Sequence, residues 1–281
     1  MALSLKNVAR SVAQRLGYDV HRHRPGAAPG LAWLDAPLAG EQGIPTEGFQ
    51  LANRSFQPKT LRYQRSRFGD DHRLKYILYF LDVRGLRTLE LGPLSGYHSI
   101  MLEKLGVAEN IAVEGRLENV RACVDVKERY QLQRTTFLHQ NIEELYSGKQ
   151  AAQFDGTFDL VFCLGVLYHL PDPGRAIEWC RTQAPRLFLS THYVEPAELL
   201  RYPNDRFVDV TYCHANRSFR AKAFREGDEN DPLSGLSPTS MWLTENDLLS
   251  LLHLAGYRRV HLLGRDLQNA LPNITLLADA E

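Results

Sequence analysis

The sequence predicts an α/β fold, a seven-stranded and mostly parallel sheet with helices on both faces. Between residues 87 and 192, short apolar segments alternate with amphipathic ones, a pattern typical of parallel strands joined by helices. Near the chain's end, two apolar segments are separated by only seven residues and a proline. Such a short connection favours a hairpin, so we expect the last strand to be antiparallel.

Composition and charge exclude several classes of protein. The 281 residues are 44% hydrophobic and 23% charged, which is typical of a globular chain and not of a disordered one. The 33 Lys and Arg balance the 33 Asp and Glu, so a globally basic nucleic-acid binder is not indicated. No run approaches the roughly 18 apolar residues of a membrane span. Four dispersed cysteines without a CxxC pair favour reduced thiols and a cytoplasmic location.

The chain divides into an N-terminal part and a main domain. We expect residues 1–73 to hold a helix, a Pro- and Gly-rich arm and a basic lid segment, and residues 74–281 to form the main domain. Strands are expected where apolar runs are short, and helices where polar and apolar faces alternate over longer segments. The expected strands are 87–92, 110–115, 135–141, 158–165, 186–192, 258–264 and 273–279. The expected helices are 3–16, 74–81, 96–105, 117–130, 174–182 and 244–256.

The alternation breaks after the fifth strand. Residues 195–240 are polar and contain Pro, Gly and the charged run FREGDENDP. We interpret them as an insertion that caps the carboxyl edge of the sheet. The helix that follows has Thr244 as its N-cap and Asp247 three residues later, as in a capping box, and Gly256 marks its end.

Two motifs at strand ends carry chemical information. Glu90-Leu-Gly92-Pro-Leu-Ser-Gly96 lies where the first strand gives way to a helix. Glycines there let the backbone approach a ligand, and the helix offers free N–H groups to an anionic end. Glu114, with Gly115 beside it, ends the second strand, where a carboxylate can accept both hydrogen bonds of a ribose. Taken singly, the first is also compatible with a tight packing turn and the second with a surface carboxylate.

A third motif, FDLVFCLGVLYHLPDP at residues 158–173, runs from the fourth strand into a turn with an aromatic residue and a histidine. In this order, the three motifs resemble the class I S-adenosylmethionine-dependent methyltransferases, over about residues 74–192. The resemblance implies a Rossmann-like sheet and S-adenosyl-L-methionine as the cofactor. Leu94 departs from the family's loop, in which a glycine usually stands at that position.

The resemblance also implies roles for single residues. Glu90 orders the loop and the methionine amino group, and Gly92 and Gly96 let the methionine part lie on the turn. Glu114 and Gly115 hold the ribose. The remaining expected cofactor contacts are Asn141 and Ile142 at the adenine, Cys163 and Leu164 near the sulfonium, Tyr168 along the methyl path, and Tyr63 or Arg67 at the methionine carboxylate. Helix capping for Asn141 and core packing for Cys163 are the alternatives.

Acceptor chemistry is less constrained. His169 and His192 follow the fourth and fifth strands and are candidate general bases, although His169 could instead fix the turn. We expect a small-molecule acceptor, natural-product or sugar-like, methylated at O or N. Its candidate contacts are Tyr193, Tyr212, Asn216, Arg217, Met241 and Trp242, with packing of the cap as the alternative for Trp242.

Three other readings stay open. The segments SGYH and GVLYH are also similar to tRNA wobble-uridine carboxymethyl-transferring enzymes, which use a carboxylated cofactor that the matching tyrosine contacts. The basic segment from Arg54 to Lys75 could contact RNA. Leu94 would fit a scaffold that has lost activity.

No metal is expected, because His21 and His23 lack nearby ligands. Exchange of the N-terminal arm between two subunits would allow a homodimer.

Overall fold

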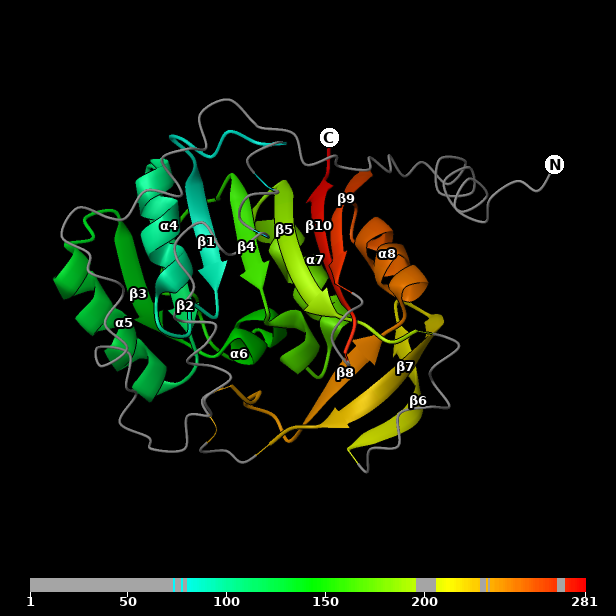
Figure 1. Ribbon diagram of the computed structural model, residues 1–281. Helices are drawn as coiled ribbons and strands as arrows, with labels where there is room; N and C mark the ends of the chain where they lie inside the picture. The colour runs from blue at the N-terminus through cyan, green and yellow to red at the C-terminus, as the bar shows by residue number, and fades with distance from the viewer. Residues whose placement is uncertain are drawn as a thin grey trace.

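The computed structural model describes residues 73, 77, 80–195, 206–227, 231, 233–266 and 271–281. The expected N-terminal helix, the Pro- and Gly-rich arm and nearly all of the basic segment lie outside these residues, as does most of the helix expected at 74–81. Figure 1 shows one large sheet with helices packed on it and a second, smaller sheet beside one of its edges.

The large sheet has seven strands in the order β3-β2-β1-β4-β5-β10-β9. Strands β1 to β5 pair in parallel, and β10 runs antiparallel to both β5 and β9. The predicted fold class is therefore confirmed, including the hairpin at the end. The strands are β1 (Arg87–Leu91), β2 (Glu109–Glu114), β3 (Thr135–His139), β4 (Leu160–Leu164), β5 (Arg186–His192), β9 (Arg259–Asp266) and β10 (Asn273–Asp279).

Helices cover both faces of this sheet because its strands are apolar on both sides. Along β4, Val161 and Cys163 belong to one buried cluster, and Leu160, Phe162 and Leu164 belong to the other. The first cluster contains apolar residues of α6, α7 and α8, and the second contains those of α4 and α5. The helices are α4 (Tyr97–Leu105), α5 (Leu117–Tyr130), α6 (Ile142–Ser147), α7 (Pro173–Gln183) and α8 (Glu245–Leu254), with a 3₁₀ turn η3 (Leu167–His169) after β4.

Local capping signals explain where α7 and α8 begin. The Asp172 side chain accepts a hydrogen bond from the Arg175 N–H at the start of α7. The Thr244 side chain accepts one from the Asp247 N–H at the start of α8, as the sequence predicts. Helix α8 ends at Leu254, and Gly256 follows with a φ of +94°. In the described part of the chain, no helix is long and apolar enough to cross a membrane.

The insertion after β5 contains a three-stranded antiparallel sheet that the sequence pattern did not predict. Its order is β6-β7-β8, with β6 (Phe207–His214), β7 (Arg217–Arg225) and β8 (Thr239–Leu243). Backbone hydrogen bonds from Met241 N–H to Leu170 C=O and from Val194 N–H to Leu243 C=O fasten β8 beside the ends of β4 and β5. Figure 1 shows this sheet beyond the arrowheads of β4 and β5, so the prediction of a cap at the carboxyl edge is confirmed.

Tyr212 anchors this small sheet to α7. Its hydroxyl donates to the Asp172 carboxylate at 2.5 Å and accepts from the Gly174 N–H at 2.9 Å. A β-carbon on Gly174 would lie 2.5 Å from the Tyr212 hydroxyl oxygen and 2.6 Å from the His214 ring. The sequence predicts Tyr212 as an acceptor contact, and the structure shows its buried side chain anchoring the cap to α7.

The substitution Gly174→Ala tests this contact, because the clash would reverse the sign of its effect on the free energy of unfolding. In an open helical site, alanine stabilises by up to about 1 kcal/mol over glycine. Here we expect the clash with Tyr212 and His214 to lower the free energy of unfolding by about 1–3 kcal/mol. Urea denaturation followed by circular dichroism measures the difference, and a stabilised variant would show that the sheet and α7 do not pack in this way.

Candidate active site

The loop between β1 and α4 is built from left-handed residues. Gly92, Leu94 and Gly96 have φ angles of +62°, +56° and +76°. A β-carbon on Gly92 would lie 2.5 Å from Val166 Cγ2, so this position has room only for glycine. Leu94 also takes a left-handed conformation, at a cost of roughly 1–2 kcal/mol for an ordinary residue.

Glu114 joins this loop to the end of β2. Its Oε2 accepts a hydrogen bond from the Leu94 N–H at 3.1 Å, and its Oε1 accepts one from the Arg116 N–H at 2.9 Å. Burial raises the pKa of the Glu114 carboxyl, and the backbone hydrogen bonds oppose that rise. The structure thus brings the two predicted motifs together at one edge of the sheet.

Glu90 lies beneath the same loop in a buried polar chain. Its Oε2 accepts hydrogen bonds from Ser99 Oγ at 2.5 Å and Asn110 Nδ2 at 2.8 Å, while its Oε1 has no partner among the described residues. Burial raises the pKa of the Glu90 carboxyl against the pull of these donors. A buried carboxylate oxygen without a donor is costly, and an ammonium group would satisfy it.

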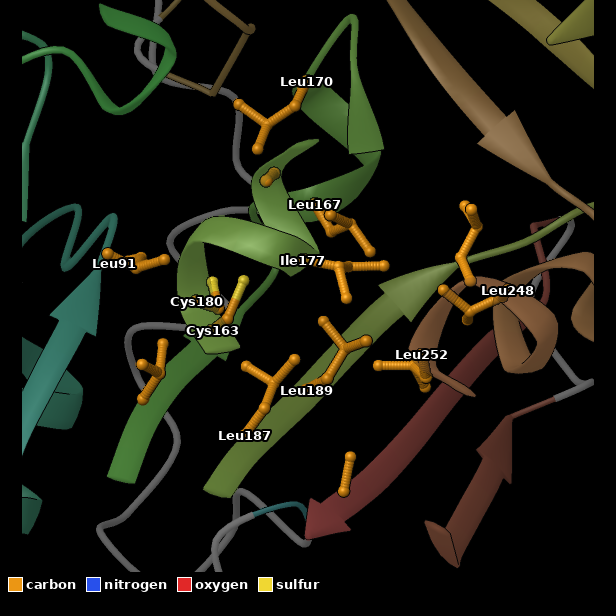
Figure 2. Close-up of a cluster of buried hydrophobic side chains, with 14 of the residues drawn as sticks. Leu91, Cys163, Leu167, Leu170, Ile177, Cys180, Leu187, Leu189, Leu248 and Leu252 are labelled. Carbon is orange, nitrogen blue, oxygen red and sulfur yellow. The ribbon is translucent and has the colours of Figure 1, made fainter. Parts of the chain in front are cut away.

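Several residues that the sequence predicts at the cofactor cap a helix or pack in the core. Asn141 is the N-cap of α6, because its side-chain oxygen accepts from the Glu143 N–H at 2.9 Å. Ile142 is buried in the core beneath α6. Cys163 faces α7, with its sulfur next to that of Cys180 in Figure 2, and burial raises the pKa of the Cys163 thiol to about 12. Leu164 packs into the core on the opposite face.

An aromatic and imidazole cluster stands where β4 and β5 end. The Tyr168 ring lies 4.2 Å from the His169 ring and 4.5 Å from the His192 ring, centroid to centroid. Trp242 of β8 stacks on His192 at 5.1 Å with an interplanar angle of 3°. Arg73 is near enough to Tyr168 to interact with it electrostatically, and burial lowers the pKa of its guanidinium to about 10. The cap thus contributes one wall of the site.

The remaining predicted acceptor contacts are not at this cluster. Tyr193 is fully buried in the core, and Asn216 and Arg217 are exposed at the turn between β6 and β7. Met241 is half-buried in β8 next to Trp242. Tyr63 and Arg67 lie outside the described residues.

Glu226, just after β7, is a site residue that the sequence analysis missed. Its Oε2 lies 3.0 Å from His169 Nδ1 and accepts from the Gly235 N–H at 2.8 Å. Burial raises the pKa of the Glu226 carboxyl, but the interactions with His169 and Gly235 outweigh it and hold the pKa below its usual value. No sequence signal distinguished Glu226 from the acidic residues that follow it in the same charged run.

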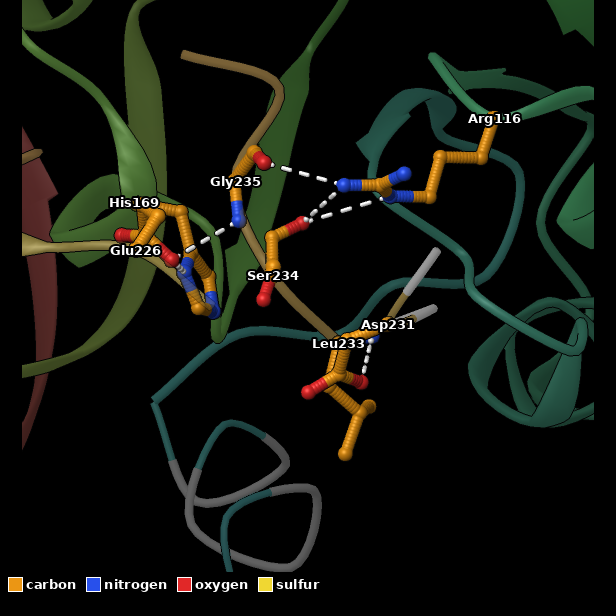
Figure 3. A network of polar contacts seen from close by, with 7 residues as sticks. All are labelled: Arg116, His169, Glu226, Asp231, Leu233, Ser234 and Gly235. Carbon is orange, nitrogen blue, oxygen red and sulfur yellow. Dashed lines mark hydrogen bonds and ion pairs between the residues drawn. The ribbon is translucent and has the colours of Figure 1, made fainter. Parts of the chain in front are cut away.

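A strap, residues 233–238, connects this pair with the end of β2. The Arg116 guanidinium donates to the carbonyl oxygens of Ser234 at 3.0 Å and Gly235 at 2.9 Å, and Leu236 packs against Gly115. Figure 3 shows Gly235 between Arg116 on one side and Glu226 and His169 on the other. Arg116, which directly follows Glu114 and Gly115, therefore binds the strap, and the strap binds Glu226.

Comparisons with known proteins identify the family of the chain. A family model described as a methyltransferase domain matches residues 61–262, which is more than half of the chain. The chain belongs to this methyltransferase domain family. The N-terminal domain of EvdMO1 with SAH bound has a TM-score of 0.61 at 24% identity, over 75% of this chain and 82% of that one. At that identity the likeness shows the shared fold.

Curated relatives match a shorter region. The ubiquinone biosynthesis O-methyltransferase of Xanthomonas oryzae pv. oryzae (strain PXO99A) is 33% identical over 135 residues, 44% of this chain and 51% of that protein. The tRNA U34 carboxymethyltransferase of Campylobacter hominis is 25% identical over 136 residues, 47% of this chain and 45% of that protein. The chain spans about half the length of the curated relatives it matches.

Among the described residues, no group of three or more His, Cys, Asp or Glu is arranged to hold a metal ion. The histidines that the sequence analysis considered for this role, His21 and His23, lie outside them.

Substitutions at Leu94 test the strained loop. Leu94→Gly removes left-handed strain but adds freedom to the unfolded chain, so we expect the free energy of unfolding to change by less than about 0.5 kcal/mol. Leu94→Val puts a β-branched residue at a φ of +56°, and we expect a loss of more than about 1 kcal/mol. Urea denaturation of both variants measures the contrast. Equal effects would mean that residue 94 is not left-handed in solution.

The raised pKa of Glu90 gives the protein a defined pH dependence. The folded state holds the Glu90 proton more tightly than the unfolded chain does, so wild-type stability recovers as pH falls through the raised pKa towards 4.5. The stability of Glu90→Gln relative to wild type should therefore be highest at pH 8 and decrease as pH falls. Urea denaturation at several pH values measures this difference, and a pH-independent difference would contradict it.

Proposed function

We propose that this protein is an S-adenosylmethionine-dependent methyltransferase that methylates an O or N atom of a small-molecule acceptor. The observation that carries the proposal is that Glu90, the left-handed loop and Glu114 meet at the carboxyl edge of neighbouring parallel strands. Open parallel sheets bind their ligands at this edge. Membership of the methyltransferase domain family supports the same activity.

The residues present fit the cofactor. The unpartnered Glu90 Oε1 would receive the methionine ammonium, and Glu114 would accept hydrogen bonds from the ribose hydroxyls. Gly92 and Gly96 supply the left-handed turn along which the methionine part would lie. The backbone after β4, at Cys163 and Leu164, would pass the sulfur, and Asn141 retains an amide nitrogen for a polar contact near the adenine.

S-adenosylmethionine supplies a methyl group on a positively charged sulfur, so its transfer to a hydroxyl forms a C–O bond, breaks the C–S bond and leaves a thioether and a proton. The protein's part is to orient the acceptor, exclude water and remove that proton. His169 and His192, the two imidazoles beside Tyr168, are the candidate bases for this proton. The half-buried Tyr168 offers a flat apolar surface to an aromatic ring or a sugar face, and the buried Trp242 packs against it.

The acceptor class is open to direct assay. Radiolabelled methyl transfer to a panel of catechols, hexoses and aromatic amines, with product identification by mass spectrometry, tests it. We expect a hydroxyl or amine compound of this size to be methylated. Methylation of tRNA alone would overturn the small-molecule assignment.

A second candidate is a tRNA wobble-uridine enzyme that uses a carboxylated cofactor. The relative from Campylobacter hominis and the proximity of Tyr168 to Arg73, which could face an added carboxylate, support it. Mass spectrometry of the ligand that copurifies with the protein separates the two, because a carboxylated cofactor is heavier than S-adenosylmethionine.

Cofactor binding depends on Glu114 under this proposal. Glu114→Ala removes the carboxylate that would accept two ribose hydrogen bonds, each worth about 1.5–3 kcal/mol when one partner is charged. We expect the Kd for S-adenosylhomocysteine to rise about 100-fold or more in isothermal calorimetry. Glu118→Ala, at an exposed position in the first turn of α5, is the matched control and should bind as wild type does. Failure of the wild type to bind would end the proposal.

A further inference from the structure

Both histidines at the site have Nδ1 held by an acceptor. His169 Nδ1 faces the Glu226 carboxylate at 3.0 Å, and His192 Nδ1 faces the Pro272 carbonyl oxygen at 3.1 Å. A carbonyl oxygen and an ionised carboxylate can only accept, so each Nδ1 must carry the proton. In the described part of the chain, His169 Nε2 makes no hydrogen bond, which leaves it able to receive a proton.

The two rings differ in how well they tolerate a positive charge. Burial lowers the pKa of His192, so its charged form is disfavoured. His169 instead faces a carboxylate whose side chain is only 2% exposed, and this partner compensates the charge of an imidazolium. In the described part of the chain, His169 therefore has a negatively charged hydrogen-bond partner at Nδ1, whereas His192 has a neutral carbonyl oxygen there.

The strap fixes the position of the Glu226 carboxylate. The Gly235 N–H donates to the same carboxylate oxygen that faces His169, and Arg116 holds the carbonyl of Gly235 (Figure 3). A β-carbon on Gly235 would lie 2.7 Å from the His169 carbonyl oxygen and 3.1 Å from the Glu226 carboxyl carbon. The strap can therefore approach His169 this closely only with glycine at position 235.

We propose that Glu226, held by the strap, is a positioning residue that keeps His169 in the Nδ1–H form, with Nε2 as the base for an acceptor hydroxyl. This role rests on the proposed methyl transfer. The acceptor O–H bond breaks, its proton passes to His169 Nε2, and Glu226 balances the imidazolium that forms. An amine nucleophile can attack before it loses a proton, so an arrangement that compensates charge at the base points to a hydroxyl acceptor.

The tautomer of His169 tests the inference without a known acceptor. Long-range ¹H–¹⁵N spectra of the ¹⁵N-histidine-labelled protein at pH 8 report which ring nitrogen is protonated. We expect a protonated Nδ1 in the wild type. Glu226→Leu removes the acceptor and should move His169 towards the Nε2–H form. Glu226→Gln should keep the Nδ1–H form, because the Gly235 N–H fixes the amide oxygen where the carboxylate oxygen was.

A second histidine–carboxylate pair provides the control. His214 Nε2 lies 2.9 Å from Glu178 Oε1 on α7, so Glu178→Leu should alter the spectrum of His214 and leave that of His169 unchanged. A wild-type His169 protonated at Nε2, or a His169 tautomer unaffected by Glu226→Leu, would overturn the proposal. Should Glu226→Leu not fold, the wild-type and Glu226→Gln spectra still decide it.

Calorimetry with S-adenosylhomocysteine on the same samples separates the two proposals. Absence of binding to the wild type would remove the methyltransferase function whatever the tautomer. Binding together with the wrong tautomer would remove only the role of Glu226. For a hydroxyl acceptor that the panel identifies, Glu226→Gln should lower kcat about 100-fold and leave the KM for S-adenosylmethionine within twofold, because the amide cannot balance the imidazolium.

Discussion

The site depends on the parallel pairing of β1 with β2 and β4. This register brings Glu90, Glu114 and the turn after β4 to one edge, although they come from three separate segments of the chain. Hydrogen bonds from the Leu94 and Arg116 N–H groups to Glu114 then tie the first loop to the second strand end. A parallel sheet covered by helices on both faces leaves this edge as the place where polar groups can converge.

The cap contributes further side chains to that edge of the sheet. Its three strands are attached by backbone hydrogen bonds next to β4 and β5, and by the Tyr212 hydroxyl at the start of α7. Trp242 reaches the imidazole of His192, and Glu226 reaches that of His169. Arg116, two residues after Glu114, hydrogen-bonds to the strap, and the strap hydrogen-bonds to Glu226 beside His169. The proposed ribose contact and the proposed base are therefore linked through these hydrogen bonds.

Within the described ranges, the three buried carboxylates have different effects on the stability of the protein. Burial raises the pKa values of Glu90 and Glu114, so these two groups destabilise the protein without a ligand at neutral pH. The pKa of Glu226 is lowered, so its ionised form contributes to stability and loses that contribution as pH falls through the lowered value. Glu90 and Glu114, the proposed cofactor contacts, thus lower the stability of the protein, whereas Glu226, beside the proposed base, raises it. Groups that lower stability in this way are typical of binding sites.

The sequence alone determined the large sheet, the capped helix α8 and the Glu90–Glu114 corner, because apolar periodicity, glycine turns and caps are local signals. Tertiary contacts decided the rest. Strand alternation puts Val161 and Cys163 on one face, but only the packing of α7 makes that face the core. Asn141 caps α6, Tyr212 anchors the cap, and Asn216 lies at an exposed turn. Glu226 is 57 residues from His169, and a contact between segments so distant in sequence leaves no periodic trace in either.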